Sequence, residues 1–468
     1  MRQLTLACGR VITLNEEQNQ AMTLLENWMN NPHDLFFLLS GYAGTGKTTL
    51  VKELLNYIDD TSRIAVAVTA PTHKAKRVIS EATGLSGFTI QKCLGLGLDT
   101  DISTFDPAQP QFKQKYTPLM PNYRLVVMDE GSMINSELLR HILRVAKTHC
   151  VKILFMADKA QLPPVNEQIS EIFSHEDIRS KFQLTKVERQ AGDNPLMSVY
   201  DKIRSNLRSA TDMFSKQTNF TDQNEGIGFL NAQEFQDGAL LSYTSEAFDA
   251  DPSHCKVLAW TNEEVGKWNR LIRKHRMNII HEGAPTGAIN RGDLMMAYAT
   301  RENYIVNSNE YMVLSASLQM LSMTYPNMKG PGTKTTTVPY ISAQAVDIDT
   351  QKAIELRIIN PRDKAAIAIW VEMYYAFIGK AKKDPKLWAD YFTFRGKLLL
   401  MEDLAYPNVK RDIDFGYALT VHRSQGSTYN EVYVVEPDIN KNRKNTERNQ
   451  LKYVALSRPR QRAYVLNR

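Results

Sequence analysis

Short apolar runs alternate with stretches of helical periodicity along the first part of the chain. Continuous apolar runs are typical of strands buried on both faces of a sheet, and they lie at residues 34–39, 64–69, 123–128 and 151–156. The helical spacing of apolar residues predicts helices over residues 14–29, 48–58, 74–82 and 136–148. Because strands alternate with helices, the pattern predicts an α/β fold built on a doubly wound parallel sheet.

The pattern changes twice further along the chain. Residues 95–122 are rich in Asp, Pro, Gln and Thr, and we expect them to form an insertion on the first sheet domain. Residues 280–360 are rich in Thr, Val, Tyr, Gly and Pro and predict a β-rich inserted domain. A second α/β unit flanks this domain, with strands expected at residues 256–260, 431–435 and 463–466 and a helix over 263–275.

Composition narrows the class of protein. The 468 residues correspond to roughly three domains, and 43% hydrophobic residues exclude a mostly disordered chain. The apolar residues 365–378 are fewer than the roughly 20 that span a membrane, so a buried helix is expected there. The four cysteines are far apart, which favours a reducing, intracellular setting without a zinc site or disulfides. The net charge of +6 is weak support for a nucleic-acid partner.

A glycine-rich segment follows the first predicted strand. Residues 41–48 (GYAGTGKT) fit the P-loop pattern G-x-x-x-x-G-K-[ST], and a predicted helix comes directly afterwards. A P-loop directs backbone N–H groups at phosphate oxygens, and the helix N-terminus adds its positive dipole. We expect Lys47 to neutralise the β- and γ-phosphates of ATP and Thr48 to bind Mg²⁺; a turn without a ligand is the alternative. The residues expected at the nucleotide are Gly41, Ala43, Gly44, Thr45, Gly46, Lys47, Thr48 and Thr49.

Polar side chains follow two further predicted strands. Asp129 and Glu130 come directly after the strand at residues 123–128, where a Walker B pair belongs beside a P-loop. Asp129 is expected to hold Mg²⁺ through water, and Glu130 to orient and activate the attacking water. Gln161, after the strand at residues 151–156, is expected to sense a γ-phosphate. Exposed carboxylates and a capped strand end are the respective alternatives.

The order of these motifs resembles that of superfamily 1 helicases, specifically the RecD/Dda-like group of superfamily 1B. The matching motifs cover nearly the whole chain in collinear order, at residues 14–18, 68–75, 89–91, 128–133, 158–165, 184–190, 257–262, 418–428 and 453–458. Two positions depart from the family pattern, since Gln91 stands where relatives often carry His, and Ala157 stands where they often carry Gly. Neither residue belongs to the expected nucleotide chemistry.

The resemblance implies two RecA-like P-loop motor domains with ATP between them. It also implies a small inserted pin and a β-rich inserted domain with a hook- or tower-like arm. The implied limits are 1–190 for the first motor domain, with the pin at about 95–122, then 191–279 and 412–468 for the second motor domain, and 280–411 for the β-rich insertion.

The resemblance further assigns roles at the nucleotide. Gln18 would read the adenine edge, and Gly426 would also lie at the nucleotide. Arg189 and Arg458 would reach the γ-phosphate, Arg458 from the second motor domain. An arginine there stabilises the charge that spreads over the transferring phosphoryl group. An ordinary surface arginine is the alternative for Arg458.

Single-stranded DNA, as the resemblance implies, crosses both motor domains. Polar side chains on its path would mostly hold phosphates, which position the strand without reading its sequence. The expected DNA-contacting residues of the motor domains are Pro71, Thr72, His73, Asn262, Thr420 and His422. A helix-capping role is the alternative for His73 and His422.

Two aromatic residues are expected where duplex DNA separates. The insertion at residues 95–122 matches the family's separation pin by position, and Phe112 is the candidate wedge at its tip, where an aromatic ring stacks on the last base pair. A small core within the insertion is the alternative. Residues 380–395 interleave basic and aromatic side chains, as in segments that stack bases and neutralise phosphates. Trp388 therefore has three candidate places: on DNA, against the pin, or in a core.

The function that the resemblance implies is that of an ATP-dependent DNA helicase, a DNA-stimulated ATP hydrolase. It would move 5′→3′ on single-stranded DNA and unwind duplex DNA in phage replication or recombination. ATP and Mg²⁺ are the expected cofactors. Single-stranded and forked DNA are the expected partners, with a single-stranded-DNA-binding protein as a further candidate. A monomer away from membranes is expected, in the cytoplasm (of the host cell if the protein is viral). Three alternatives stay open: an RNA-directed helicase of the same superfamily, a P-loop nucleotide kinase, and a nonenzymatic DNA-binding module switched by nucleotide.

Overall fold

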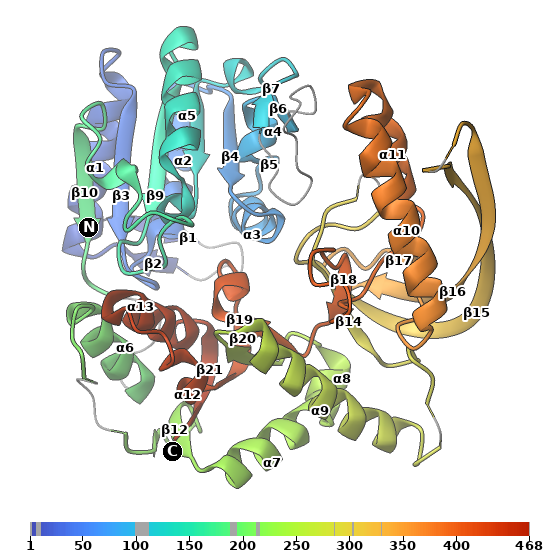
Figure 1. The fold of residues 1–468 in the computed structure, drawn as a ribbon. Helices are drawn as coiled ribbons and strands as arrows, with labels where there is room; N and C mark the ends of the chain where they lie inside the picture. Colours follow the sequence, from blue (N-terminus) through green and yellow to red (C-terminus); the bar gives the residue numbers. More distant parts are fainter. Residues whose placement is uncertain are drawn as a thin grey trace.

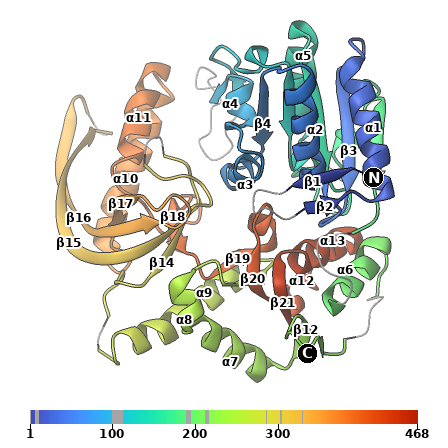
Figure 2. The same ribbon diagram turned by 180° about the vertical axis from the view of Figure 1, so that it is seen from behind.

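Two α/β domains and a β-rich domain make up the molecule (Figure 1). The first α/β domain lies above the second, and the β-rich domain lies beside both; the view from behind shows the same arrangement (Figure 2). The computed structural model describes residues 2–5, 11–98, 112–187, 194–211, 216–284, 286–301, 304–328 and 330–467.

The first α/β domain contains a six-stranded sheet and a short N-terminal hairpin. Its strands are β1 (Gln3–Thr5), β2 (Val11–Thr13), β3 (Phe36–Gly41), β4 (Val66–Ala70), β5 (Gly87–Thr89), β8 (Leu125–Met128), β9 (Lys152–Ala157) and β10 (Ser180–Leu184). Its helices are α1 (Glu16–Asn30), α2 (Lys47–Thr61), α3 (His73–Thr83), α4 (Ile90–Cys93) and α5 (Ser136–His149). The sheet is parallel in the order β10-β3-β9-β8-β4-β5.

The sheet of this domain is buried on both faces. All four residues of β8 are buried, as the continuous apolar run predicts. Side chains from α1 and α2 pack into one apolar cluster, and those from α5 pack into another. The doubly wound parallel sheet predicted for this part of the chain is confirmed.

The second α/β domain is assembled from two separate parts of the chain. Its strands are β11 (Asn219–Phe220), β12 (Gly226–Leu230), β13 (Cys255–Ala259), β19 (Ala418–Thr420), β20 (Tyr429–Val434) and β21 (Pro459–Leu466). Its helices are α6 (Pro195–Ser205), α7 (Ala232–Tyr243), α8 (Glu246–Ala250), α9 (Asn262–Ile280), α12 (Glu436–Ile439) and α13 (Asn445–Leu456). The strand order is β11-β12-β21-β20-β13-β19, and only the β11–β12 pair is antiparallel among these described strands.

The β-rich domain is inserted between those two parts. Its strands are β14 (Leu294–Ala297), β15 (Glu310–Pro326), β16 (Thr333–Asp347), β17 (Ala353–Ile359) and β18 (Ile413–Phe415), and its helices are α10 (Lys364–Ala381) and α11 (Trp388–Arg395). The antiparallel order β17-β16-β15-β14-β18 places β18 in this sheet, just beyond the expected limit at residue 411. The long β15–β16 hairpin curves along the outside of α10 (Figures 1 and 2). In the described part of the chain, no helix has both the length and the apolar character to cross a bilayer.

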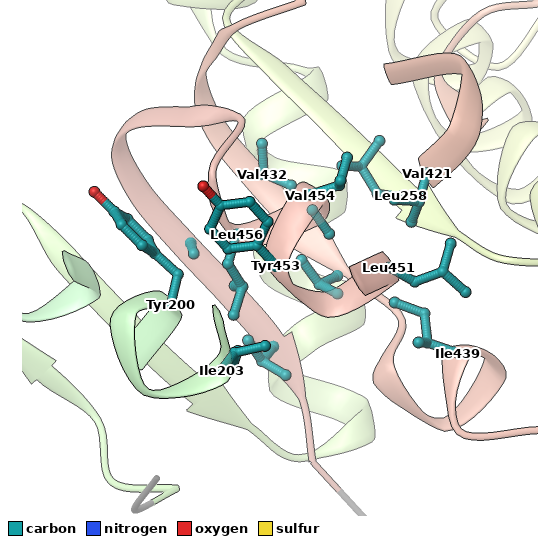
Figure 3. Packing of buried hydrophobic residues seen from close by; sticks show 14 of the residues in the cluster. Tyr200, Ile203, Leu258, Val421, Val432, Ile439, Leu451, Tyr453, Val454 and Leu456 are labelled. Carbon is teal, nitrogen blue, oxygen red and sulfur yellow. The ribbon is translucent and has the colours of Figure 1, made fainter. Parts of the chain in front are cut away.

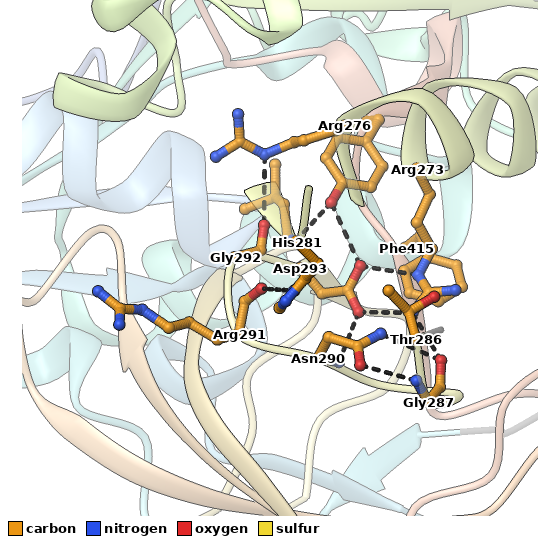
Figure 4. Close-up of polar contacts among 12 residues, drawn as sticks. Arg273, Arg276, His281, Thr286, Gly287, Asn290, Arg291, Gly292, Asp293 and Phe415 are labelled. Atoms are coloured by element: carbon orange, nitrogen blue, oxygen red, sulfur yellow. Dashed lines mark hydrogen bonds and ion pairs between the residues drawn. The ribbon is translucent and has the colours of Figure 1, made fainter. Parts of the chain in front are cut away.

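A buried ion pair fastens the inserted domain to α9 (Figure 4). Asp293, just before β14, is fully buried, and the Nε and Nη2 atoms of Arg273 in α9 donate to its two carboxylate oxygens at 2.7 and 2.8 Å. The N–H of Asn290 donates to Oδ2 of Asp293 at 2.8 Å. The guanidinium of Arg273 also lies 4.6 Å from the ring centroid of Phe415 in β18. Both ends of the insertion are therefore held by one helix of the second α/β domain.

The structure corrects the expectations for the two aromatic residues at the fork. Phe112 lies in β7 (Phe112–Gln114), which pairs with β6 (Leu96–Leu98), and it stands opposite Leu98 rather than at the tip of the hairpin. The residues between the two strands lie outside the described part of the chain. The side chain of Phe112 is 41% exposed, so it does not form a small core.

Trp388 is a core residue of the β-rich domain. Its side chain is 3% exposed, and it packs in the apolar cluster formed by α10, α11 and the hairpin strands. The ring lies edge-on against Tyr391, with the centroids 5.3 Å apart. The predicted contact with DNA is therefore wrong in this structure, because a ring on the inner face of α11 leaves no surface for a base.

Candidate functional site

The P-loop joins β3 to α2 through two glycines in the left-handed region. Gly44 and Gly46 have φ angles of 81° and 88°, which side chains with a Cβ rarely adopt. The Nζ of Lys47 donates to the carbonyl oxygens of Gly41 and Tyr42 at 2.6 and 3.0 Å, so the ammonium lies over the loop. The loop thus combines a flexible backbone, a positive side chain and a helix N-terminus, the combination that binds phosphate groups.

Gln18 supports the P-loop from the start of α1. It forms a capping box with Asn15, whose N–H donates to Oε1 of Gln18 at 3.0 Å. The Nε2 of Gln18 donates to the carbonyl oxygen of Thr45 at 3.2 Å. A Cβ at Gly46 would lie 2.4 Å from that nitrogen, so only glycine fits between them. Gln18 is therefore a brace of the loop, and its role at the adenine edge stays a prediction.

The carboxylates of Asp129 and Glu130 lie at the end of β8, two strands away from β3 in the sheet order. The N–H of Glu130 donates to Oδ1 of Asp129 at 2.8 Å, and Glu130 adopts a left-handed φ of 51°. Burial, and then the charge of Asp129, raise the pKa of Glu130 to about 7. Burial also raises the pKa of Asp129, while the charge of Lys47 opposes this. A carboxyl whose pKa lies near the working pH is suited to accept a proton from water.

The segment after β9 brings Asp158 and Gln161 to the same edge of the sheet. Ser132 holds Asp158 in place, since its Oγ donates to the carbonyl oxygen of Asp158 at 2.8 Å and accepts from its N–H at 2.9 Å. Gln161 is 7% exposed, and within the described residues no donor reaches its Oε1. A buried amide oxygen without a partner is costly unless a ligand satisfies it. Gln161 therefore fits its expected place beside a bound phosphate.

Arg458 comes from the second α/β domain and lies near these acidic groups. Its guanidinium donates to the carbonyl oxygens of Val454 and Ser427 at 3.0 and 3.3 Å. It is 5% exposed, which rules out an ordinary surface arginine. The charge of Arg458 lowers the pKa values of Glu130 and Asp158, although burial raises both more strongly. The charge of an arginine of one domain thus acts on carboxyl groups of the other.

The other predicted nucleotide residues have the following places. Thr48 and Thr49 lie in the first turn of α2, and the Thr48 hydroxyl with the Asp129 carboxylate gives the hard oxygen donors that Mg²⁺ prefers. Gly426 packs against Ala75 of α3, and it therefore lies against the first domain near the start of that helix. Arg189 lies outside the described residues.

A second functional region is a cavity of about 680 Å³ between the three domains. Four of the predicted DNA-contacting residues line it, one from the first α/β domain and three from the second: Thr72, Asn262, Thr420 and His422. Pro71 and His73 flank Thr72 but are not among the lining residues. The sequence motifs that were assigned to one ligand therefore converge on one cavity.

Neither His73 nor His422 is the N-cap of its helix. Thr72 is the N-cap, because its Oγ1 accepts from the N–H of Ala75 at 3.2 Å, and His73 is the first helical residue. His422 lies in the 3-10 helix Val421–Ser424, whose N-cap is Thr420. Burial, and then the charges of Lys76 and Lys92, lower the pKa of His73 below its ordinary value. The lowered pKa favours the neutral imidazole, which can donate a hydrogen bond but adds no charge.

Three further lining residues, Tyr298, Arg411 and Arg423, are not among the predicted DNA-contacting residues. The guanidiniums of Arg411 and Arg423 lie 3.7 and 4.1 Å from the ring centroid of Tyr298. Arg411 also donates to Oδ1 of Asn262 at 3.0 Å, and Arg423 to Oδ1 of Asn307 at 3.0 Å. These side chains belong to loops and a short 3-10 helix without periodicity, and only the proximity of Arg423 to His422 in the motif could have indicated one of them.

Comparisons with known proteins agree with this geometry. Residues 13–225 match the AAA domain family, and residues 415–466 match the UvrD-like helicase C-terminal domain family. The chain is 29% identical over 244 residues to the ATP-dependent DNA helicase dda of Enterobacteria phage T4, covering 50% of this chain and 51% of that helicase. It is 31% identical over 187 residues to the ATP-dependent RecD2 DNA helicase of Deinococcus radiodurans, covering 40% of this chain and 23% of that helicase. The chain is thus similar to ATP-dependent DNA helicases of the Dda, RecD2 and Pif1 groups.

Two further similarities extend over nearly the whole chain. The uncharacterized protein R530 of Acanthamoeba polyphaga mimivirus is 25% identical over 519 residues, covering 96% of this chain and 98% of that protein. A Pif1 structure described for DNA unwinding at forked duplexes has a TM-score of 0.51 at 16% identity and covers 97% of this chain and 92% of its own. At that identity the likeness concerns the fold, and it agrees with the expected class of two RecA-like motor domains with inserted elements.

Proposed function

We propose that this protein is an ATP-dependent DNA helicase that moves 5′→3′ along single-stranded DNA and unwinds duplex DNA. The observation that carries the proposal is the pairing of two sites at the junction of the motor domains. The charge of Arg458 in one motor domain lowers the pKa of Glu130 in the other. Thr72 and Thr420, one from each motor domain, line the same cavity. A change in the distance between the domains therefore acts on both sites at once.

The ATP chemistry divides among residues of both motor domains. Lys47 neutralises the β- and γ-phosphates, and Thr48 and Asp129 would hold Mg²⁺, which would offset phosphate charge. Glu130 accepts the proton of the attacking water, since its pKa of about 7 matches that task. Arg458 stabilises the charge that develops on the transferring phosphoryl group. Hydrolysis then depends on closure of the two domains.

The cavity suits a phosphate backbone more than a base sequence. Besides the carboxylates of Glu402 and Asp403, its walls carry hydroxyl, amide and imidazole groups from motifs of both motor domains, together with Lys74, Arg411 and Arg423. Such groups hold phosphates and position a strand without reading its sequence. We therefore propose single-stranded DNA and forks as partners, for a monomer that acts in phage replication or recombination, in the cytoplasm of the host cell. A single-stranded-DNA-binding protein is a further candidate partner.

The test is ATP hydrolysis with and without single-stranded nucleic acid. A DNA helicase hydrolyses ATP slowly alone and faster with single-stranded DNA, and Glu130→Gln abolishes both rates without abolishing ATP binding. Equal or greater stimulation by RNA would favour an RNA-directed helicase. Phosphate transfer to free nucleotides would indicate a kinase, and ATP binding without turnover would indicate a nucleotide-controlled switch.

A further inference from the structure

One tyrosine hydroxyl joins the two motor domains at the P-loop. Tyr453 lies in α13 of the second motor domain, and its hydroxyl donates to Oδ2 of Asp158 at 2.7 Å. The same oxygen accepts from the N–H of Ala43 at 3.1 Å. Ala43 belongs to the P-loop and Asp158 follows β9, so both partners belong to the first motor domain. A single phenol therefore bridges a phosphate-binding loop and the carboxylate beside it.

The second motor domain holds this phenol firmly. The Tyr453 side chain is fully buried in an apolar cluster, and its ring meets that of Tyr200 edge-on, with centroids 6.2 Å apart and planes at 78° (Figure 3). Val454 and Leu456 of the same helix pack in that cluster. Because the ring is fixed by packing, the position of its hydroxyl follows the position of the whole second motor domain.

Two neighbouring contacts cross the same interface without reaching a P-loop amide. The Nε2 of Gln450, also in α13, donates to the carbonyl oxygen of Gln161 at 2.9 Å. The guanidinium of Arg204 in α6 lies 4.0 Å from the ring centroid of Tyr42. These contacts hold the domains together, whereas the hydroxyl of Tyr453 engages a backbone N–H of the loop that is expected to bind phosphate.

We propose that Tyr453 is a positioning residue that links phosphate binding in the P-loop to the contact between the motor domains. An N–H group carries one hydrogen, so the amide of Ala43 cannot bond fully to a phosphate oxygen and to the Tyr453 hydroxyl together. Phosphate at this amide releases one of the two bonds by which the phenol joins the domains. By reciprocity, the same bond opposes nucleotide binding. This inference rests on the proposed ATP-driven activity. Its test must therefore distinguish a failure of the role of Tyr453 from a failure of the proposed helicase function.

The test is Tyr453→Phe, which removes the hydroxyl and keeps the packed ring. The binding of a non-hydrolysable ATP analogue is measured by calorimetry with and without single-stranded DNA, beside ATPase rates. Without its competitor, the Ala43 amide is free for phosphate, so the analogue binds roughly two- to tenfold tighter, the range of one net hydrogen bond. The ratio of the analogue affinity with DNA to the analogue affinity without DNA moves toward one. The reason is that Tyr453→Phe removes part of the coupling between the nucleotide site and the DNA site.

Two control variants separate this role from a structural one. Tyr243 is also fully buried, accepts from the N–H of Val257 at 3.1 Å and donates to the carbonyl oxygen of Tyr417, all within the second motor domain. Tyr243→Phe therefore lowers thermal stability without changing the affinity for the analogue. Gln450→Met removes a contact between the domains at the carbonyl oxygen of Gln161, and it does not tighten analogue binding, because it releases no amide of the P-loop.

Unchanged or weaker binding of the analogue by Tyr453→Phe would overturn the proposal. Equal tightening by Gln450→Met would overturn it as well, because any loosening of the interface would then suffice. A wild-type protein without DNA-stimulated ATP hydrolysis would contradict the proposed helicase function instead, whatever the analogue affinities of the variants.

Discussion

Removing the charge of Arg273 tests how the inserted domain is held to the second motor domain. The carboxylate of Asp293 is fully buried and receives two bonds from Arg273, at 2.7 and 2.8 Å. Arg273→Met keeps an unbranched apolar side chain but leaves that carboxylate with the N–H of Asn290 at 2.8 Å and the Tyr417 hydroxyl at 3.4 Å. Breaking one side of a buried pair costs about 3–5 kcal/mol, because an uncompensated charge stays buried.

The assay is thermal unfolding followed by circular dichroism. At about 2–4 °C per kcal/mol for a unit of 150–250 residues, the loss corresponds to a fall in Tm on the order of 10 °C. Arg270→Met is the matched control, because Arg270 is exposed on the same helix and its loss should cost less than about 0.5 kcal/mol. The double variant Arg273→Met with Asp293→Asn should lose less than Arg273→Met alone, since neither charge is then left unpaired. A loss below about 1 kcal/mol in Arg273→Met would refute this reasoning.

Three further predictions concern the sites themselves. Lys47→Ala should keep the fold but lower kcat for ATP by about 10²-fold or more, because it removes a charge beside the β- and γ-phosphates; a wild-type rate in a coupled ATPase assay would contradict the P-loop assignment. Arg458→Ala should lower kcat about 10³-fold or more with little change in ATP affinity, and a normal kcat would transfer the role to Arg189. Arg423→Gln should weaken single-stranded DNA binding equally for all sequences and reduce the slope of log affinity against log salt by about 1, as measured by fluorescence anisotropy at several salt concentrations. An unchanged slope would exclude a phosphate contact.

The fold and much of the site could be predicted from local patterns. Continuous apolar runs located β3, β4, β8 and β9 to within a few residues, because strands buried on both faces need apolar residues at every position. The ends of parallel strands meet at one edge of the sheet. The motif positions after those strands therefore indicated that the P-loop, Asp129 and Gln161 would lie together.

What the sequence could not provide was the direction of side chains and the pairing of distant residues. The basic and aromatic composition around Trp388 fits a DNA-stacking segment and a helix of a core equally well, and only the packing of α11 on α10 decides between them. The hairpin register, which places Phe112 opposite Leu98, is likewise a property of the fold. Tyr453 and Asp158 are 295 residues apart, and no local period connects them.

The most direct test of the central claim is unwinding of forked duplexes that carry only one single-stranded tail. We predict that, with ATP and Mg²⁺, the protein separates a duplex with a 5′ tail and leaves one with a 3′ tail intact. Lys47→Ala should separate neither substrate. Preference for the 3′ tail would contradict the proposed direction, and ATP hydrolysis stimulated by DNA without strand separation on either substrate would contradict the proposed helicase function.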